Sequence, residues 1–346
     1  MPDITINVMM LGGRRCGKTS VLAFMQPCFE RVFAGTNLTI EPVQEAFTRL
    51  KKRHIEINEY FKNKNHRITY FPSPDFSPTT GRNSYEFKIG IQDKTTDEII
   101  VNFIDTPGEW LTNGNFKNLT EIMNTSHVII VAIDSPYLME ESESYAEENN
   151  PGKYNEFRNH CETIGKWVKK YFADESNLSA KMILFVPLKC ERYYHEGRMD
   201  ELNKKTKKAY ASTLDFFKSK EECYEVAITP ILTFGGEKEG VEFRYFDWDE
   251  KGKILEDENS KLPKSIVYRI PREMEKPEPL HCEQPVVYLL AYILKVISQN
   301  IDVGFFNRTF RNFASAQDFL DELDTIKTRM KRDDNGYEIV QNPLEL

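Results

Sequence analysis

The sequence has 346 residues, enough for one large α/β domain or two small domains with a substantial buried core. Its 54 acidic and 46 basic residues give a formal net charge of −8, which argues against a nucleic-acid-binding chain. The basic clusters at 49–54 and 204–208 lie in helical patterns, so we interpret them as solvated helix faces rather than as polyanion sites.

The six cysteines lie at 16, 28, 161, 190, 223 and 282 without any C-x-x-C pairing. This pattern is typical of a reduced, cytoplasmic protein without a structural metal site. The strongest apolar run, 286–297, has 12 residues, whereas a membrane-spanning helix needs about 20. We therefore expect a cytoplasmic protein with no membrane span and interpret this run as a buried helix.

The first apolar segment, 4–11, predicts a strand, and the pattern G-x-x-x-x-G-K-[ST] follows it directly. Such a loop turns backbone N–H groups toward phosphate oxygens, and the next helix points its positive dipole end at the same anion. Lys18 is expected to contact the β- and γ-phosphates, and Thr19 to give its hydroxyl to Mg²⁺. The alternative is a glycine-rich turn with a solvated lysine. The expected nucleotide-contacting residues are Gly12, Gly13, Arg14, Arg15, Cys16, Gly17, Lys18, Thr19 and Ser20.

The next segments predict additions to a minimal nucleotide-binding fold. After a first helix to about Phe33, apolar residues recur at spacings of three and four and predict a helical insertion at 41–64. Within it, His54 is interpreted as a packing residue rather than a ligand. The proline-rich segment 71–81 predicts a loop, and the apolar patterns at 85–91 and 99–104 predict an antiparallel hairpin.

Three nearly continuous apolar runs, at 128–133, 182–186 and 224–228, predict strands buried on both faces of a parallel sheet. Amphipathic helices are expected between them, one carrying the apolar residues Phe157, Cys161, Ile164, Val168 and Tyr171, and another carrying Leu202, Tyr210, Leu214 and Phe217. The alternation of strand and helix predicts an α/β fold with a doubly wound, mostly parallel sheet that contains one reversed strand.

The remaining segments predict surface additions and a closing helix. Residues 139–150 are acidic and predict a surface loop, while 241–271 predicts a late β-hairpin insertion. The helix at 286–297 closes the sheet, and a further helix carries Phe319, Leu323, Ile326 and Met330, after which the last dozen residues are expected to fray. The expected organisation is a P-loop domain over 1–312, followed by a C-terminal helix and tail over 313–346.

Asp105 ends an apolar strand, where open α/β sheets present their ligands. An acidic residue there can hold Mg²⁺ through a water, and Gly108 can give its N–H to a γ-phosphate. The alternative is a simple Asp-Thr-Pro-Gly turn. Thr79 or Thr80, in the loop before the hairpin, can complete the metal's coordination only while the γ-phosphate is present.

Glu109 is the candidate for orienting or deprotonating the attacking water, and the alternative is a purely structural acid. Arg14, Arg15 and Arg82 are candidates for stabilising the developing charge in cis, and a partner protein can supply such an arginine in trans.

The base is expected to bind after the fourth parallel strand, at Lys189 and Glu191. The stem of the lysine would lie over the base, and the carboxylate would accept from guanine N1 and N2, whereas adenine presents an acceptor at N1. The segment resembles the N/T-K-x-D guanine element with two departures, because Leu188 replaces the amide or hydroxyl residue and glutamate replaces aspartate. Thr233, after the next strand, is a candidate for the last base contact.

In this order, the motifs resemble those of the translation-factor-related (TRAFAC) class of P-loop GTPases. Pro78-Thr79-Thr80-Gly81, 105–110 and 187–192 are similar to the bacterial double-GTPase and YcjX-like families, over about 4–300. The resemblance implies a Ras-like fold, GTP/GDP and Mg²⁺ as cofactors, a protein partner, and a slowly hydrolysing switch in a bacterial setting such as a defence or conflict operon. The residues leave open an ATPase or nucleotide kinase, and a nucleotide-binding scaffold without hydrolysis.

Overall fold

The computed structural model describes most of the chain in eleven stretches. These are residues 4–62, 71–72, 81–93, 99–140, 152–173, 181–220, 224–235, 240–244, 250, 267–298 and 321–346. Thr79 and Thr80, most of the acidic segment 139–150, and Phe319 lie outside the described residues. The predictions made for them therefore remain predictions.

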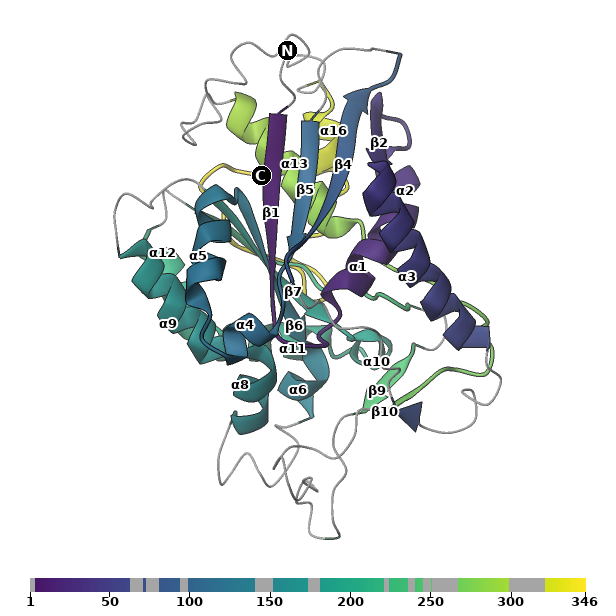
Figure 1. The fold of residues 1–346 in the computed structure, drawn as a ribbon, viewed down its shortest axis with the longest axis vertical. Helices are drawn as coiled ribbons and strands as arrows, with labels where there is room; N and C mark the ends of the chain where they lie inside the picture. Colours follow the sequence, from purple (N-terminus) through teal and green to yellow (C-terminus); the bar gives the residue numbers. More distant parts are fainter. Residues whose placement is uncertain are drawn as a thin grey trace.

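An eight-stranded sheet runs through the molecule in the order β11-β8-β7-β6-β1-β5-β4-β2 (Figure 1). Strands β5, β1, β6, β7 and β8 are parallel. Strand β4 runs antiparallel to β5 and to β2, and β11 runs antiparallel to β8. The strands are β1 (Ile4–Leu11), β2 (Leu38–Pro42), β4 (Asn83–Ile91), β5 (Ile99–Asp105), β6 (Val128–Asp134), β7 (Lys181–Leu188), β8 (Tyr224–Ile228) and β11 (Glu338–Gln341).

The mostly parallel α/β sheet predicted from the sequence is confirmed, but two strands, β4 and β11, are reversed rather than one. The last dozen residues do not fray as expected, because β11 pairs with β8 and the side chain of Leu346 is 3% exposed. Strand β2 was also not predicted. Both missed strands are short, so their alternation carries little periodic signal.

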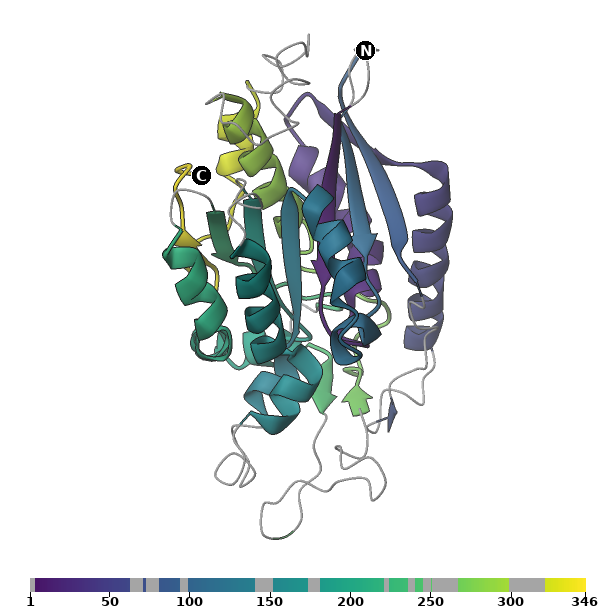
Figure 2. The ribbon, with the colours of Figure 1, turned by 60° about the vertical axis from the view of Figure 1, so that its left-hand side comes forward.

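Helices cover both faces of the sheet because alternate side chains of its central strands enter two separate cores (Figure 2). In β1, Val8 and Met10 face one core, while Met9 and Leu11 face the other. The first core includes residues of α1 (Lys18–Met25), α2 (Phe29–Phe33), α3 (Gln44–Lys62), α13 (Gln284–Ser298) and α16 (Leu323–Lys327). The second includes residues of α4 (Glu109–Thr112), α5 (Phe116–Thr125), α9 (Cys161–Phe172), α10 (Glu191–His195), α11 (Met199–Ala209) and α12 (Ala211–Lys218).

Three predicted helices are interrupted, and one of them, predicted to carry Leu202 to Phe217, is divided at Tyr210 into α11 and α12. The first predicted helix ends at Met25 and continues through the 3-10 turn η1 (Gln26–Cys28) into α2, because the ring of Pro27 does not fit a continuous α-helix. Another is divided at His160, which adopts φ 52° between α8 (Lys153–Asn159) and α9. Phe157 therefore leaves the predicted apolar stripe and is 42% exposed.

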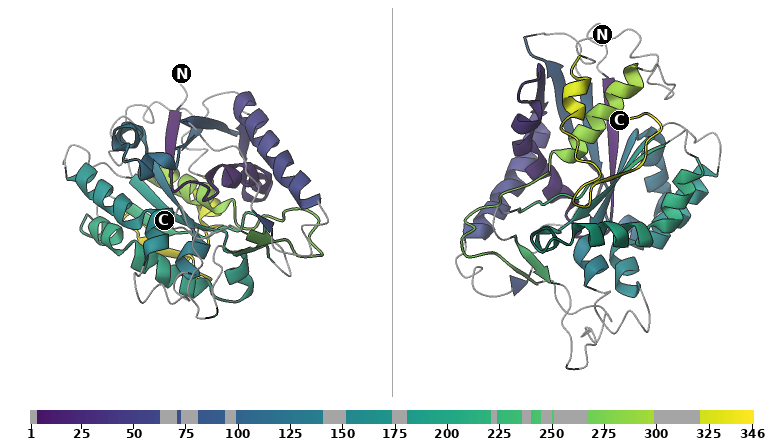
Figure 3. Two further views of the ribbon diagram at one scale, coloured as in Figure 1. Left: turned by 60° about the horizontal axis from the view of Figure 1, so that its bottom comes forward. Right: turned by 180° about the vertical axis from the view of Figure 1, so that it is seen from behind.

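The added elements lie on one side of the main sheet, where α3 runs along the β2 edge and a small second sheet lies near the carboxyl ends of the strands (Figure 1; Figure 3, left). Helix α3, predicted within 41–64, buries Leu50, Ile57 and Phe61, and His54 packs with its ring centroid 5.1 Å from that of Phe24. In a second, three-stranded sheet, β9 (Glu242–Arg244) pairs with β10 (Val267–Arg269) as the late hairpin predicts. Strand β3 (Phe71–Pro72) joins β10, so the segment expected to be only a loop begins as a strand.

Helices α6 (Ser135–Met139) and α8 lie beyond the carboxyl ends of the central strands (Figure 1). Seen from behind, α13 and α16 cover the half of the sheet in which β1 begins (Figure 3, right). Among the helices that the structure describes, none combines the length and apolar character needed to cross a bilayer. The five cysteines in the described stretches are free thiols.

Candidate functional site

The loop Gly12–Gly17 connects the end of β1 to the start of α1 at Lys18, as the phosphate-loop pattern predicts. Gly17 has a φ of 112°, which a side chain would oppose, and Arg15 is held at a φ of 61°. The side chains of Arg14 and Arg15 are exposed, whereas that of Cys16 is buried. Arg82, the third arginine considered as a charge-stabilising group, is also exposed.

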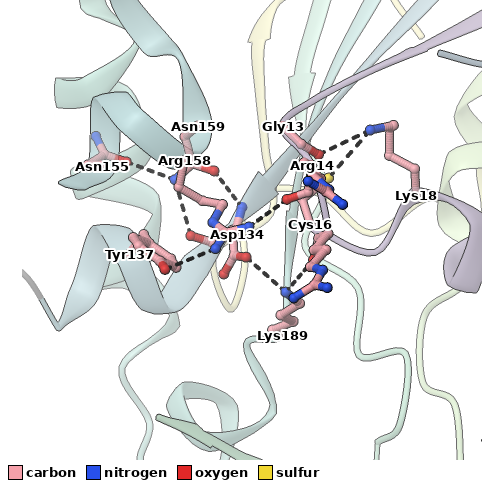
Figure 4. A network of polar contacts seen from close by, with 11 residues as sticks. Gly13, Arg14, Cys16, Lys18, Asp134, Tyr137, Asn155, Arg158, Asn159 and Lys189 are labelled. Carbon is pink, nitrogen blue, oxygen red and sulfur yellow. Dashed lines mark hydrogen bonds and ion pairs between the residues drawn. The ribbon is translucent and has the colours of Figure 1, made fainter. Parts of the chain in front are cut away.

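Cationic side chains hold four successive carbonyls of this loop, and Figure 4 shows the contacts of Lys18 with Gly13 and of Arg158 with Arg14. The Nζ of Lys18 donates to the oxygens of Gly12 and Gly13 at 2.7 and 3.2 Å. The carbonyl oxygens of Arg14 and Arg15 accept from Arg158 Nη1 at 2.6 Å and from Lys189 Nζ at 2.8 Å. Because a trans peptide points its N–H opposite to its C=O, each held carbonyl fixes the direction of the next N–H group.

Thr19 and Asp105 are adjacent although they are far apart in the sequence. The Oγ1 of Thr19 donates to Oδ2 of Asp105 at 2.6 Å, and the Asp105 side chain is fully buried. The next residue, Thr106, fixes this strand end to β1 by donating its hydroxyl to the carbonyl of Met10 at 2.7 Å. A hydroxyl and a carboxylate at this position are hard oxygen ligands, which suit Mg²⁺ when phosphate oxygens and waters complete its octahedron.

Gly108 and Glu109 lie directly against the phosphate loop. A Cβ placed on Gly108 would lie 2.2 Å from the backbone nitrogen of Arg14, so the two segments are in direct backbone contact. Glu109 begins α4 and forms an ion pair with Arg14, Oε1 to Nε, at 3.1 Å. With exposed side-chain fractions of 35% and 52%, this pair is open to solvent and can rearrange.

Lys189, which directly follows β7, contacts both the loop Gly12–Gly17 and the end of β6. Besides the carbonyl of Arg15, its Nζ contacts Oδ2 of the fully buried Asp134 at 2.8 Å. Asp134 ends β6 as Asp105 ends β5, so both carboxylates stand at the same edge of the sheet. The ammonium also lies 6.0 Å from the centre of the Phe243 ring in β9.

Glu191 is fully buried, and its Oε1 accepts the backbone N–H of Phe234 at 2.9 Å. Burial raises the pKa of this carboxyl to about 7, although backbone donors and Lys189 favour its ionised form. A Cβ added to Gly240 would lie 2.7 Å from the Cβ of Glu191, so the chain before β9 packs directly on this side chain. Thr233 is 6% exposed in the adjoining loop, which is fixed by reciprocal hydrogen bonds between Leu232 and Leu280.

Four residues of this region did not emerge from the sequence: Asp134, Tyr137, Arg158 and Asn159. Asp134 had a recognisable signal, because it is an acidic residue at the end of an apolar strand, as Asp105 is. Arg158 had none, because 144 positions separate it from the loop residue whose carbonyl it contacts. Long-range placement of this kind depends on how α8 packs and not on a local motif.

Comparison with known proteins gives distant matches in structure. No protein-family model matches the sequence, and no curated protein sequence matches it. Similar solved structures include the Ski7 GTPase-like domain of S. cerevisiae bound to GTP, with a TM-score of 0.39 and 13% identity, and the same domain bound to GDP and inorganic phosphate, with 0.38 and 12%. Each match covers 67% of this chain and 43% of the other.

The chain distantly resembles a GTPase-like domain. At this level of similarity the comparison assigns no family and says nothing of activity. It also spans less than half of the matched chains.

The contact between Gly108 and the phosphate loop predicts that a side chain at position 108 destabilises the protein. Gly108 precedes α4 with angles, φ −62° and ψ −26°, that alanine also adopts, so the backbone conformation alone does not exclude a side chain. We nevertheless expect Gly108→Ala to lower the free energy of unfolding by about 1–3 kcal/mol, because its Cβ would overlap the Arg14 backbone. Urea denaturation measures the change.

Gly81→Ala is the matched control, because a Cβ at Gly81 would meet nothing within 4 Å and its φ is not positive. It should change the free energy of unfolding by less than about 0.5 kcal/mol. If Gly108→Ala is as stable as Gly81→Ala, the two segments are not packed as described.

Proposed function

We propose that this chain binds GTP and GDP at the Gly12–Thr19 loop and slowly hydrolyses GTP as a molecular switch. The observation that carries the proposal is the arrangement of the loop backbone, whose carbonyls at 12–15 are held by Lys18, Arg158 and Lys189. This arrangement fixes the peptide planes from which the N–H groups of a phosphate cradle would come. The helix α1, which begins at Lys18, would add its positive dipole end.

Mg²⁺ would be held by Thr19 and Asp105. Their direct hydrogen bond of 2.6 Å brings the two oxygen ligands within reach of one ion. This pair supplies only part of a coordination shell, as is usual for Mg²⁺ bound together with nucleotide phosphates. When bound, the ion would neutralise charge on the β- and γ-phosphates. Thr79 or Thr80 remains the proposed further ligand from the loop before β4.

Guanine would be selected by Lys189, Glu191 and Thr233. Lys189 already spans from the phosphate loop to Asp134, and Glu191 presents a carboxylate at the end of the same segment. An ionised carboxylate accepts hydrogen bonds only, which matches the N1 and N2 donors of guanine. Because Gly240 packs on Glu191, base binding is proposed to require adjustment of the chain before β9.

Hydrolysis would use Glu109. Its ion pair with Arg14 keeps the carboxylate beside the loop, and admission of a γ-phosphate between Gly108 and Arg14 would separate these segments. Glu109 would then orient or deprotonate a water, and Arg14 would be free to turn toward the phosphate. A carboxylate cannot donate a hydrogen bond as an amide does, which fits a slow intrinsic rate. Loop order would thus depend on the terminal phosphate, and a partner protein would read it.

Thermal unfolding with four nucleotides tests the binding proposal. GTP and GDP with Mg²⁺ should stabilise the protein, by roughly 2.7 kcal/mol at 100 times the dissociation constant, and ATP and ADP should stabilise it less. Lys18→Ala should abolish the GTP response, because it removes the buried cation of the loop.

Lys166→Ala is the control for this measurement, because Lys166 is 80% exposed on α9 and pairs with Glu162. It should retain the full GTP response. Stronger stabilisation by ATP than by GTP would favour the ATPase or kinase alternative, and no response to any nucleotide would refute the proposal.

The pKa of Glu191 predicts how guanine binding depends on pH. With a pKa of about 7, this carboxyl is protonated in most molecules at pH 6, and it must lose that proton to accept the two guanine donors. GTP affinity should therefore fall about tenfold per pH unit below 7 and level off above it. Isothermal titration calorimetry between pH 6 and 8.5 measures the profile.

Glu191→Gln has no titrating carboxyl at this position. It should bind GTP more weakly than the wild type at pH 8, and its affinity should not show the fall below pH 7 that protonation of Glu191 causes. Titration of the nucleotide phosphate is common to both proteins and cancels in the comparison. Identical profiles for the two proteins would remove Glu191 from base recognition.

Glu109→Gln tests the hydrolytic role. The substitution preserves the length of the side chain, so GTP affinity should change by less than about threefold. Single-turnover release of phosphate should fall by about 10²-fold if the carboxylate takes the water's proton. Glu45→Gln, an exposed acid paired with Arg49 on α3, serves as the control. Unchanged hydrolysis in both Glu109→Gln and Glu109→Ala would make Glu109 a structural acid and favour another group.

A further inference from the structure

The junction between α8 and α9, formed by Arg158, Asn159 and His160, packs directly against the phosphate loop. A Cβ placed on Gly13 would lie 2.0 Å from the carbonyl oxygen of Arg158, so the two backbones approach as closely as glycine permits. His160 lies on the same side, with its Cδ2 3.6 Å from that position. Only a residue without a side chain fits at position 13, whatever role Gly13 has toward phosphate.

The side chain of Arg158 continues this contact (Figure 4). Its Nη1 donates to the carbonyl of Arg14 at 2.6 Å, and its Nη2 donates to the hydroxyl of Tyr137 at 3.0 Å. The guanidinium also lies over the Tyr137 ring, 4.7 Å from its centre. Tyr137 belongs to α6 and is 3% exposed, so it holds the guanidinium in one orientation.

Asn159 fastens the junction to the sheet. Its side-chain amide pairs with the backbone of Asp134, accepting the N–H at 2.7 Å and donating to the carbonyl at 3.2 Å. The backbone carbonyl of Asn159 accepts a hydrogen bond from the hydroxyl of the buried Tyr210 at 3.2 Å. The junction is therefore fixed to the end of β6, and a movement of the phosphate loop relative to β6 must strain it.

The junction also contacts the second segment expected at the terminal phosphate. Nε2 of His160 lies 3.4 Å from Oγ1 of Thr112, the last residue of α4. Helix α4 directly follows Gly108, which is packed on Arg14. The three residues Arg158, Asn159 and His160 thus touch the phosphate loop, the end of β6 and α4.

We propose that Arg158 is a positioning residue of the phosphate loop and that the α8–α9 junction is a third nucleotide-responsive element. By holding the Arg14 carbonyl, Arg158 fixes the peptide that carries the N–H of Arg15. A γ-phosphate must separate Gly108 from Arg14, and α4 then moves relative to His160. GDP has no terminal phosphate to impose this separation, so the junction distinguishes the two nucleotides. This part of the inference rests on the proposed nucleotide binding.

Three variants test the positioning role. Arg158→Ala should weaken GTP and GDP binding by about tenfold or more, the effect of losing one charge-assisted hydrogen bond in the cradle. Arg158→Lys should recover part of the affinity, because an ammonium can still donate to the Arg14 carbonyl. Lys153→Ala is the matched control: it removes an exposed cation of the same helix, which lies over Tyr154, and should leave affinity unchanged.

Hydrogen exchange distinguishes positioning from general stability. In the nucleotide-free protein, Arg158→Ala should speed exchange of the amides at 13–16 while those of α5 exchange as in the wild type. In the wild type, GTP should slow exchange at 153–160 more than GDP does, and Arg158→Ala should abolish this difference. If Arg158→Ala unfolds the chain, Tyr137→Phe replaces it, because this variant removes only the hydroxyl that accepts from Arg158. It should give the same effects with smaller magnitude.

The outcomes separate the two proposals. If the wild type binds GTP and Arg158→Ala matches it in affinity and exchange, the positioning role is wrong while the proposed function stands. If the wild type binds no nucleotide, the proposed function fails together with the nucleotide response of the junction. Exchange at 13–16 in the free protein then still decides whether Arg158 orders the loop.

Discussion

The structure depends on holding the carbonyls of one short loop so that the neighbouring N–H groups have fixed directions. Three cations do this, and each comes from a different part of the chain: Lys18 from the start of α1, Lys189 from the end of β7, and Arg158 from the end of α8. They meet because parallel strands deliver their carboxyl ends to the same edge of the sheet. The fold therefore orders the loop through its own side chains, which lowers the entropic cost of binding an anion there.

Several elements also meet at Phe234, whose backbone N–H donates to Glu191. The Phe234 ring packs against Phe24 of α1, Phe61 of α3 and Phe243 of β9, with ring centres 5.4–5.8 Å apart. Both added elements, the long helix and the late hairpin, thus reach the loop that is proposed to contact the base. Burial of Glu191, to which the chain before β9 contributes at Gly240, raises the pKa of its carboxyl to about 7. Displacement of either element would change the environment of the proposed base site, so the proposed binding could be regulated from a surface that does not touch the nucleotide.

Local patterns predicted most of the fold but only part of the site. The sequence placed the phosphate loop between β1 and α1 and set Asp105 at a strand end, and the structure brings Asp105 to Thr19 at 2.6 Å. It did not predict β11, whose pairing depends on β8, or the break at His160, whose φ of 52° interrupts an apparently continuous stripe. It also could not predict Arg158, because the contact with Arg14 arises from the packing of α8 and has no local signature.

The close contact between Gly108 and Arg14 leaves no space between the two segments. No atom can lie between two backbones in contact, so anything bound there must move one of them. The phosphate loop is held on three sides, by Lys18, Arg158 and Lys189, whereas Glu109 and α4 are joined to it by the solvent-exposed pair with Arg14 and by the contact between Thr112 and His160. Fewer charged side chains therefore hold Gly108 and α4 to the loop than hold the loop to the rest of the fold. If the proposed nucleotide binds, its terminal phosphate would displace Gly108 and α4 rather than the loop, and the contact between Thr112 and His160 would be the first to change.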